Sequence, residues 1–351
     1  MKILLLPADV AGCGYYRMLW AGAHLQSQGH DINIWWPKKD TGIEIKFIGE
    51  QIVDCIVPGG ADVLVMQRVS HHWHAQVIKL LRSKGIAVVV DMDDDLNQIH
   101  KLNAAYLNYH PRSNTPYSWK NAQQACNDAT LVTVSTKSLL GVYARHGRGM
   151  HIDNYVPASY LTIPEQHEEV FGWAGTTQSH PVDLQVTGPA VRDLVNDGYK
   201  FRVIGPPSNV QQALRLKEPP AVTGIIPLEH WAEALSQLKV AIAPLEMSPF
   251  NTSKSRLKAI EASACGIPWV ASPRQEYRKL HRECGAGILA DTPKAWYKAI
   301  KQLMDDDAMR KDLGQRGREY MQTQTIEANS WRHLEAWTYA YELQQADRGS
   351  R

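Results

Sequence analysis

The chain contains 351 residues, of which 44% are hydrophobic and 21% are charged, and its formal net charge is +2. That length is too great for one typical hydrophobic core and suits two domains, while the near-neutral charge argues against a polybasic, nucleic-acid-binding body. The five cysteines are scattered without a C-x-x-C pair, which argues against a disulfide framework and against a cysteine zinc site.

The chain opens with a short apolar strand at residues 2–6, a turn that contains Gly12 and Gly14, and a helix expected over 15–27. A strand, a glycine turn and a helix in this order are typical of the start of a doubly wound nucleotide-binding domain. The turn lacks the third glycine of the dinucleotide fingerprint, so an ordinary tight turn is the alternative interpretation. Arg17 lies in the first turn of the helix, where we expect it to face the second domain and approach a phosphate.

Further elements are expected at 31–36, 43–47, 62–67 and 72–83. The next strand, 86–91, runs into a cluster of aspartates, Asp91, Asp93, Asp94 and Asp95, and ligands gather at the carboxyl ends of strands in open α/β sheets. Three interpretations stay open: an Asp-x-Asp pair that holds a divalent metal, a carboxylate of raised pKa that handles an acceptor, and a set of caps for the next helix. We favour acceptor handling by Asp91 or Asp93.

Aromatic and basic side chains are mixed in two stretches, residues 71–74 and 100–128. Such a mixture can stack on a ring and attract a phosphate, or it can be a loop that packs on its own aromatic side chains. The histidines show no H-x-x-x-H pair with an acid on one helix, so no histidine metal site is predicted.

A strand at 130–135 with its helix completes the first half, and the proline-containing segment 157–167 marks the domain boundary. The pattern then restarts with a strand at 169–174. A loop of small and hydroxyl residues follows this strand, and its Gly175 and Thr176 let backbone N–H groups approach phosphate oxygens.

The remaining strands are expected at 200–204 and 240–244, and the last helices at 293–305, 307–323 and 325–346. The final helix presents Trp331, Leu334, Trp337 and Tyr341 at helical spacing. An apolar face of this kind predicts that the helix packs against a domain.

The stretch from Pro249 to Pro273 carries the clearest functional pattern. A loop, a helix that begins at Lys254 and a buried strand are expected in quick succession. Lys254 and Ser255 at the start of this helix would offer an anion an ammonium group, free backbone N–H groups and the positive end of the helix dipole. Glu261 lies seven residues further on, roughly 10 Å along the axis on the same face, which is about the distance from a diphosphate to its ribose. The alternative is that Lys254 and Glu261 are ordinary solvated residues.

The segment KSRLKAIEASACGIPWVAS, residues 254–272, resembles the nucleotide-ribose segment of GT-B glycosyltransferases of the glycogen-synthase-like, mostly retaining branch. In that branch two glutamates separated by seven residues precede a turn with glycine and proline, and the second glutamate, here Glu261, holds the ribose. The first glutamate, which contacts the donor sugar, falls on Ser253, so the chain departs from the family there. The loop after residue 174 resembles the family's diphosphate loop, and the turn at 12–17 resembles that of phage-borne glycosyltransferases.

This resemblance implies an α/β protein with the GT-B fold, in which two Rossmann-like, doubly wound domains face each other across a cleft. The acceptor-side domain is expected at residues 1–157, the nucleotide-sugar domain at 168–324, and a C-terminal helix that crosses back to the first domain at 325–351.

The implied activity is the transfer of a sugar from a nucleoside diphosphate sugar, UDP- or GDP-linked, to a hydroxyl acceptor, with retention and without a metal or a separate cofactor. The catalytic candidates are Asp91, Asp93 and Lys254. The donor contacts are expected from Gly12, Gly14, Arg17, Gly175, Thr176, Lys254, Ser255 and Glu261.

The candidate acceptors are a hydroxymethylated pyrimidine in phage DNA and a hydroxyl group of a virion protein. A sugar-nucleotide 2-epimerase of the same fold and a non-catalytic nucleotide-binding module are the alternatives. The apolar run at 3–6 is too short for a secretory leader or a membrane span, so we expect a cytoplasmic protein, located in the host cytoplasm if a phage encodes it.

Overall fold

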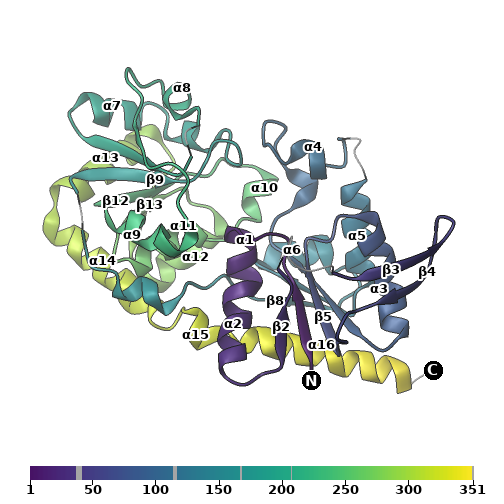
Figure 1. The fold of residues 1–351 in the computed structure, drawn as a ribbon. Coiled ribbons are helices and arrows are strands. Elements are labelled where there is room, and N and C mark those ends of the chain that lie inside the picture. Colours follow the sequence, from purple (N-terminus) through teal and green to yellow (C-terminus); the bar gives the residue numbers. More distant parts are fainter. Residues whose placement is uncertain (37–41, 114–116, 167, 207, 350–351) are drawn as a thin grey trace. The chain divides into compact units, whose positions relative to one another are not determined.

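The computed structural model describes residues 1–36, 42–113, 117–166, 168–206 and 208–349. The chain divides into two compact units (Figure 1). The first unit comprises Met1–Ile99, Ala105–Asn154 and Ile326–Arg351, and the second comprises His100–Ala104 and Tyr155–Thr325. Each unit is built on its own six-stranded sheet.

The sheet of the first unit has the strand order β2-β1-β5-β6-β7-β8, and all its neighbouring strands are parallel. Its strands are β1 (Ile3–Leu6), β2 (Ile32–Ile34), β5 (Val63–Gln67), β6 (Ala87–Met92), β7 (Leu131–Val134) and β8 (Gly149–His151). All residues of β5 and β6 are buried, as expected for strands that helices cover on both faces. The strand order reverses between β1 and β5, which is where an open sheet of this kind binds its ligands.

The helix predicted at 15–27 is present, but it is not uniform. It begins with α1 (Gly12–Gly14), continues through a π-helical turn η1 (Tyr15–Leu19) and ends with α2 (Trp20–Ser27). The other helices of this part of the chain are α3 (His72–Ser83), the 3-10 turn η2 (Leu96–Gln98), α4 (Tyr106–Tyr109), α5 (Ser118–Asp128) and α6 (Lys137–Tyr143).

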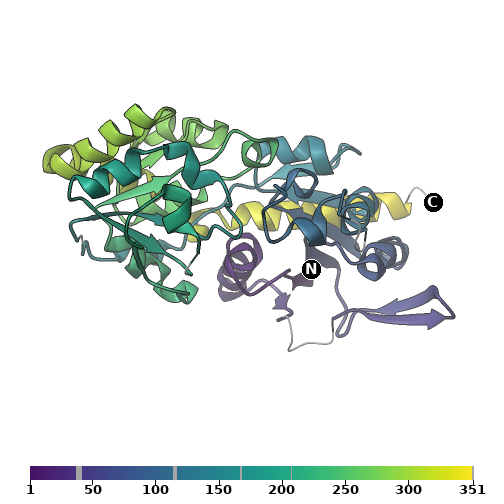
Figure 2. The same cartoon turned by 90° about the horizontal axis from the view of Figure 1, so that it is seen from above.

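A β-hairpin stands apart from the main sheet of the first unit. Its strands β3 (Glu44–Ile48) and β4 (Gln51–Ile56) are antiparallel, and Figures 1 and 2 show them extending away from that sheet. The sequence predicted the first of these strands and not its partner. The ring of Phe47 meets the ring of Trp73 edge-on at 4.8 Å, so the aromatic stretch at 71–74 packs in part against its own chain.

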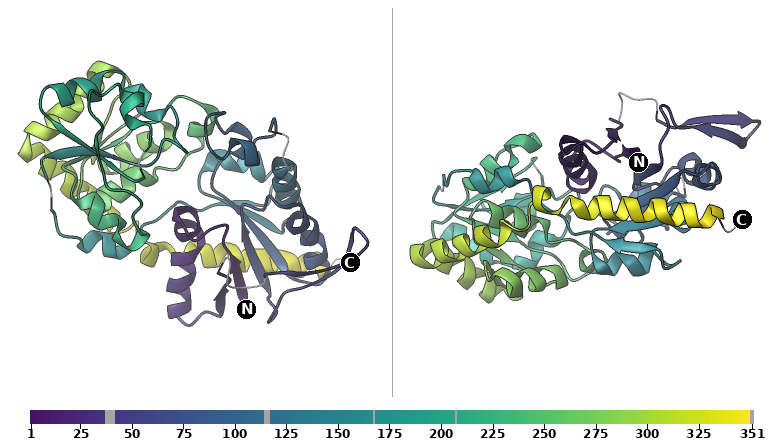
Figure 3. Two further views of the ribbon diagram at one scale, coloured as in Figure 1. Left: turned by 45° about the horizontal axis from the view of Figure 1, so that its top comes forward. Right: turned by 90° about the horizontal axis from the view of Figure 1, so that it is seen from below.

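The C-terminal helix α16 (Trp331–Gly349), which follows α15 (Ile326–Asn329), covers β5, β6 and β7 of the first unit (Figure 3). The predicted helix packs against a domain through a face that is shifted from the predicted one and shares Trp337 with it. Its buried residues are His333, Ala336, Trp337, Ala340 and Gln344. Trp331, which the sequence placed on the apolar face, is exposed, because the stripe that meets the sheet begins two residues later.

The sheet of the second unit has the strand order β11-β10-β9-β12-β13-β14, again with parallel neighbours. Its strands are β9 (Val170–Ala174), β10 (Lys200–Ile204), β11 (Ala221–Val222), β12 (Val240–Ala243), β13 (Trp269–Ala271) and β14 (Gly287–Leu289). This is the 3-2-1-4-5-6 order of the Rossmann fold, whose ligand site lies where the order reverses, here between β9 and β12. The large buried side chains Phe171, Trp173 and Trp296 fill its core.

The helical elements of the second unit are η3 (Ala158–Thr162), η4 (Asp183–Thr187), α7 (Ala190–Asn196), α8 (Val210–Leu214), η5 (Leu228–His230), α9 (Trp231–Ser236), α10 (Pro249–Thr252), α11 (Leu257–Ala264), α12 (Gln275–Cys284), α13 (Pro293–Asp305) and α14 (Asp307–Met321). Within the residues that the structure describes, no helix is both long enough and apolar enough to cross a membrane.

The helix predicted from Lys254 is present as α11 but starts later than predicted, and the short helix α10 precedes it. Ser248 caps α10, since its hydroxyl accepts a hydrogen bond from the backbone N–H of Asn251, and Pro249 occupies the first turn. The chain therefore turns once before Lys254, and α11 starts only at Leu257.

Candidate functional site

In the second unit, the ends of β9 and β12 lie at the point where the strand order reverses. Gly175 follows β9 directly, and the segment after β12 leads into α10. One side chain connects the two segments: the Asp183 carboxylate accepts hydrogen bonds from the backbone N–H of Glu246 at 2.8 Å and from Asn251 Nδ2 at 2.7 Å. This junction is where we place the candidate site.

Glycines allow the backbone to pack closely at this edge of the sheet. A Cβ on Gly205, which follows β10 and has a φ of +143°, would lie 2.3 Å from the carbonyl oxygen of Gly175. The loop after Gly175 is a tight turn in which His180 N donates to the carbonyl of Thr176 at 3.0 Å, and the Thr176 hydroxyl accepts from Gln178 N at 3.2 Å. Gly175 and Thr176 therefore shape a compact loop at the strand end, as a phosphate-binding loop requires.

The segment 100–104 holds this loop from outside, although it is far away in the sequence. Asn103 Nδ2 donates to the carbonyl of Ser179 at 2.8 Å, and Ala104 N donates to the carbonyl of Gln178 at 2.9 Å. These contacts explain why the segment belongs to the second unit.

Lys258 is the lysine that reaches the loop, and the sequence analysis did not single it out. It lies in the first turn of α11, its ammonium donates to the carbonyl of Ala174 at 2.7 Å, and it stands 5.7 Å from the centroid of the Trp173 ring. Burial lowers the pKa of Lys258, an effect that the charge of Glu261 opposes and the charge of Lys254 reinforces. The K-x-x-E spacing, which places two residues on one face of a helix, was the signal available in the sequence.

Glu261 is buried, with 4% of its surface exposed, which contradicts the interpretation of an ordinary solvated carboxylate. It shares α11 with Lys258, not with Lys254. Lys254 and Ser255 lie between α10 and α11, so the expected pair of residues two turns apart on one helix is corrected. The Lys254 ammonium stands 4.5 Å from the centroid of the Phe250 ring, just ahead of the N-terminus of α11.

Half-buried His180 and buried Asp183 form a pair beside Lys258. His180 Nδ1 lies 2.7 Å from Asp183 Oδ2. Burial lowers the pKa of His180 to about 4, and the charge of Lys258 lowers it further. The hydrogen bond to Asp183 acts to raise it but is outweighed. Burial by itself raises the pKa of Asp183, but the hydrogen bonds that this carboxylate accepts outweigh burial and leave the pKa below its ordinary value. At neutral pH the imidazole is therefore neutral and the carboxylate ionised.

Arg17 and Asp91, two predicted site residues of the first unit, are engaged with each other. The guanidinium of Arg17, which is 1% exposed, donates to Asp91 at 2.8 and 3.0 Å and to the carbonyl of Ile152 at 2.6 Å. The Thr133 hydroxyl, on the neighbouring strand, also donates to Asp91, at 2.7 Å. The expectation that Arg17 approaches a phosphate and Asp91 an acceptor is therefore corrected, because both side chains are buried in a satisfied ion pair.

Asp93 is paired with Arg68, which follows β5. The carboxylate accepts two hydrogen bonds from the Arg68 guanidinium, one of them at 2.8 Å, and Arg68 also reaches Asp94 at 3.3 Å. Burial acts to raise the pKa of Asp93, but the charge and hydrogen bonds of Arg68 outweigh burial and hold it below its ordinary value. Asp93 is thus an ionised carboxylate, not the raised-pKa base that crowding predicted.

The capping interpretation applies to Asp95. Its carboxylate accepts from Asn97 N at 3.1 Å at the start of η2, and burial raises its pKa. Within the described residues, no group of three or more histidine, cysteine or acidic side chains could hold a metal ion.

Gly12 and Gly14 take part in a tight turn at the end of β1. The Asp9 carboxylate accepts from Gly14 N at 2.9 Å, and a Cβ on Gly14 would lie 2.0 Å from the carbonyl oxygen of Asp9. A Cβ on Gly12 would meet nothing within 4 Å. The turn therefore requires glycine at position 14, whereas a side chain at position 12 would meet no other group of the turn.

The second aromatic stretch is partly self-packed. The rings of Tyr106 and His110 stack with centroids 4.4 Å apart, and the Lys120 ammonium lies 4.9 Å from the centroid of the Tyr117 ring. Residues 114–116 of this stretch lie outside the described residues.

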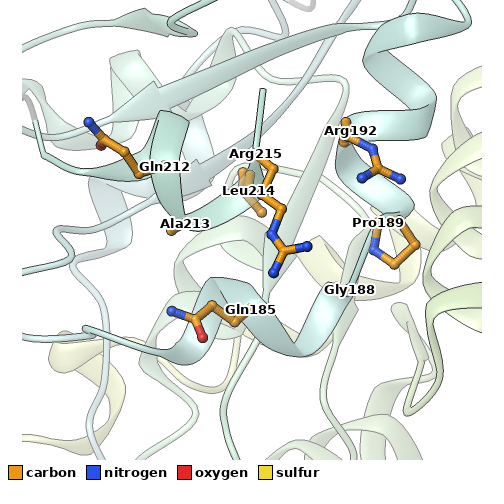
Figure 4. Close-up of a pocket in the computed structure, with 8 residues that line it drawn as sticks. All are labelled: Gln185, Gly188, Pro189, Arg192, Gln212, Ala213, Leu214 and Arg215. Atoms are coloured by element: carbon orange, nitrogen blue, oxygen red, sulfur yellow. The ribbon is translucent and has the colours of Figure 1, made fainter. Parts of the chain in front are cut away.

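A polar cavity of about 590 Å³ lies elsewhere in the second unit, and Figure 4 shows side chains from η4, α7 and α8 around it. It is lined by Gln185, Gly188, Pro189, Arg192, Gln212, Ala213, Leu214 and Arg215. None of the predicted donor residues lines this cavity, so it is distinct from the candidate site.

Residues 168–306 match the family model described as Glycosyl transferases group 1. A comparison with curated proteins found no match. Among solved structures, the chain is similar to sucrose-phosphate synthase (tll1590) from Thermosynechococcus elongatus, with 16% identity, a TM-score of 0.68, and coverage of 97% of this chain and 100% of that one.

The chain is also similar to Anabaena Alr3699/HepE in complex with UDP, with 14% identity, a TM-score of 0.62, and coverage of 97% and 100%. Staphylococcus aureus TarM, solved with UDP and saccharides, gives 16% identity and a TM-score of 0.54, over 80% of this chain and 55% of TarM. The fold is therefore that of the GT-B glycosyltransferases, and the family match within its second unit supports a group 1 glycosyltransferase.

Proposed function

We propose that this chain transfers a sugar from a nucleoside diphosphate sugar, UDP- or GDP-linked, to a hydroxyl acceptor. The observation that carries the proposal is the placement of Lys258 and buried Glu261 on one short helix, beside the Gly175 loop and at the reversal of strand order. A cation beside a tight strand-end loop suits a diphosphate, and a buried carboxylate one turn further on suits a pair of ribose hydroxyls. The relative HepE was solved with UDP, which supports a nucleotide donor.

In the proposed reaction, the bond between the sugar C1 and the diphosphate oxygen breaks, and C1 forms a bond to the acceptor oxygen. Negative charge grows on the leaving diphosphate. Lys258, together with Lys254, Ser255 and the Thr176 loop, stabilises that charge electrostatically, and Glu261 holds the ribose. For a retaining transfer, the leaving phosphate takes the acceptor proton.

On the acceptor side we retain Asp93 and not Asp91. The Asp91 carboxylate already accepts hydrogen bonds from Arg17 and Thr133, whereas Asp93 lies at the end of β6 with about 10% of its side chain exposed. An ionised carboxylate with a lowered pKa is a poor proton acceptor at neutral pH but a good hydrogen-bond acceptor. We therefore assign Asp93 the orientation of the acceptor hydroxyl.

The donor assignment is tested with Glu261→Ala. Initial rates over a range of UDP- and GDP-sugar concentrations should show a donor KM at least about tenfold higher than in the wild type, because a carboxylate to the ribose hydroxyls contributes about 1.5–3 kcal/mol. The matched control is Glu229→Ala, an exposed glutamate in η5 of the same unit. Unchanged donor kinetics in Glu261→Ala would remove Glu261 from the site.

The acceptor is tested with radiolabelled donor and a panel that contains a saccharide, a peptide and DNA with hydroxymethylated cytosine. Labelling of one acceptor above plain DNA identifies its class, and NMR of the product's anomeric proton distinguishes retention from inversion. An epimerised nucleotide sugar without transfer would favour the 2-epimerase, and donor binding without any turnover would favour a non-catalytic module.

A further inference from the structure

The charges around the Gly175 loop balance one another only while no ligand is bound. Lys254 and Lys258 supply two positive charges, Asp183 and Glu261 supply two negative charges, and each acts on its neighbours through space. A diphosphate brings further negative charge into this buried cluster. Because unpaired charge is costly in a low-dielectric site, one of the groups present must then change its charge state or the anion binds weakly.

His180 is the group in this cluster whose ordinary pKa lies closest to neutral pH, so a bound anion can bring its charge change back toward that range. Its Nδ1 is held by Asp183, which is itself fixed by Glu246 N and Asn251, so the ring orientation is set from two segments. The hydrogen bond printed for the ring within the described residues uses Nδ1, and 13% of the His180 side chain is exposed. A neutral ring that donates from Nδ1 to a carboxylate carries its lone pair on Nε2, where a proton can be added.

The charged groups that act on His180 in the described part of the chain all belong to this cluster. Asp183 lies on η4, Lys258 on α11, and Lys254 on the segment ahead of α11, while the Trp173 ring of β9 packs edge-on with its centroid 6.4 Å away. The two lysines disfavour the imidazolium in the free protein. An anion bound between those lysines and His180 would cancel that effect.

We propose that His180 takes up a proton when a nucleoside diphosphate binds, and that the resulting imidazolium holds the diphosphate together with Lys258. This inference rests on the proposed donor site. The proton comes from solvent and adds to Nε2, while the Nδ1–H stays on Asp183. The imidazolium then donates to a phosphate oxygen, and no covalent bond to the ligand forms.

The sign of the pH dependence follows from this uptake. Free His180 has a pKa of about 4, and the bound anion raises it. Between those two values the affinity for the diphosphate rises as the pH falls, and it levels off once the free protein also carries the proton. The terminal phosphate of the ligand titrates as well, so the contribution of His180 must be measured as a difference between variants.

Isothermal titration of UDP, and of GDP, into the full chain at pH 7 in buffers of different ionisation enthalpy measures the protons taken up. We expect His180→Gln to take up fewer protons than the wild type, by as much as one, and to bind UDP at least tenfold more weakly. The control is His230→Gln, which removes a histidine with the same i,i+3 pairing, Nδ1 to Glu233 at 3.0 Å, but with an exposed ring. His230→Gln should match the wild type.

Equal proton numbers for the wild type and His180→Gln would overturn this inference and leave the donor site intact. A wild type that binds neither UDP nor GDP would overturn the proposed function and this inference together. Should His180→Gln not fold, Lys258→Met decides: we expect a loss of UDP affinity of at least tenfold with uridine affinity within twofold. Equal losses for UDP and uridine would show a purely structural lysine and would also overturn the inference.

Discussion

The carboxyl ends of the two sheets carry their charges in opposite ways. In the first unit, guanidinium groups are paired with carboxylates in double hydrogen bonds, Arg17 with Asp91 and Arg68 with Asp93. In the second unit, Lys258 donates to a main-chain carbonyl, and His180 keeps one ring nitrogen available.

This difference separates charges that fix a framework from charges that can serve a ligand. The charges of a buried pair such as Arg17 and Asp91 neutralise each other within the protein. Removing one partner leaves the other as a buried charge without a counter-charge. An ammonium that is held only by a carbonyl can exchange that contact for a phosphate oxygen at little cost. We therefore expect substitution of the buried Arg17–Asp91 pair to act on stability and substitution of Lys258 or His180 to act on ligand binding.

The largest effect is expected for Arg17→Met. It leaves the Asp91 carboxylate buried without its counter-charge, which should lower the free energy of unfolding by about 3–5 kcal/mol. Urea unfolding followed by circular dichroism measures it, and the double variant Arg17→Met/Asp91→Leu should recover much of the loss. The control is Asp193→Asn in the exposed pair with Arg192, where about 0–1 kcal/mol is expected. Similar losses in both variants would contradict the framework role.

The comparison is sharpened by the same kind of substitution in the second unit. Lys258→Met removes a cation whose hydrogen bond within the described residues goes to a main-chain carbonyl, and it relieves the burial of a charge. Its unfolding midpoint in urea should be equal to the wild-type value or higher. The kcat/KM for sugar transfer should fall about 100-fold, the scale seen when one donor to a developing charge is lost. A destabilisation like that of Arg17→Met would refute the distinction between the two units.

A third test concerns the backbone at the candidate site. Gly205→Ala places a Cβ against the carbonyl of Gly175 at a positive φ, so a loss of about 1–3 kcal/mol is expected, together with weaker donor binding. Thermal unfolding and UDP titration measure the two effects. Gly141→Ala, in the helix α6 with open space around its Cα, should be neutral or stabilising. If both variants behave alike, close approach at Gly205 is not required.

The smallest effect is expected for Asp93→Asn and depends on pH. The pKa of Asp93 is lowered in the folded protein, so its contribution to stability is present above the unfolded pKa of about 3.9 and is lost as the pH falls through the folded value. The difference in unfolding free energy between the wild type and Asp93→Asn should narrow as the pH falls from about 5 to about 3. In Asp93→Asn the Arg68 guanidinium keeps its contact with Asp94 at 3.3 Å, which limits the loss of unfolding free energy. A difference that widens in acid would exclude the ion pair as its source.

The architecture was largely predictable from the sequence because apolar strands and amphipathic helices can be recognised from residues that are close together in the chain. The helix α3 and the strand β10 begin and end at the predicted residues, and the GT-B resemblance found at 254–272 agrees with the fold. The start of the helix in the stretch 249–264 was misjudged, because Asn251 to Ser253 looked like N-terminal caps. In the structure they belong to or follow α10, a separate short helix that Ser248 caps ahead of Pro249.

The chemistry of the site was less predictable because it depends on contacts over long sequence separations. Arg17 is 74 residues from Asp91, and nothing local distinguishes an arginine that meets a phosphate from one that meets a buried aspartate. His180 and Asp183 are close in sequence, but their importance comes from Lys258 and from the segments that fix Asp183. Lys254 was chosen over Lys258 from the sequence because the start of the helix was placed about one turn ahead of Leu257, where α11 begins.

The helix α16 delays the burial of the first sheet during biosynthesis. Strands β5, β6 and β7 are translated well before His333, Trp337 and Gln344, the residues of α16 that cover them. All residues of the second unit are translated before that covering helix is complete. One side of the first sheet therefore stays uncovered until α16 has been translated, and a nascent chain stalled before residue 331 should be a preferred client of chaperones.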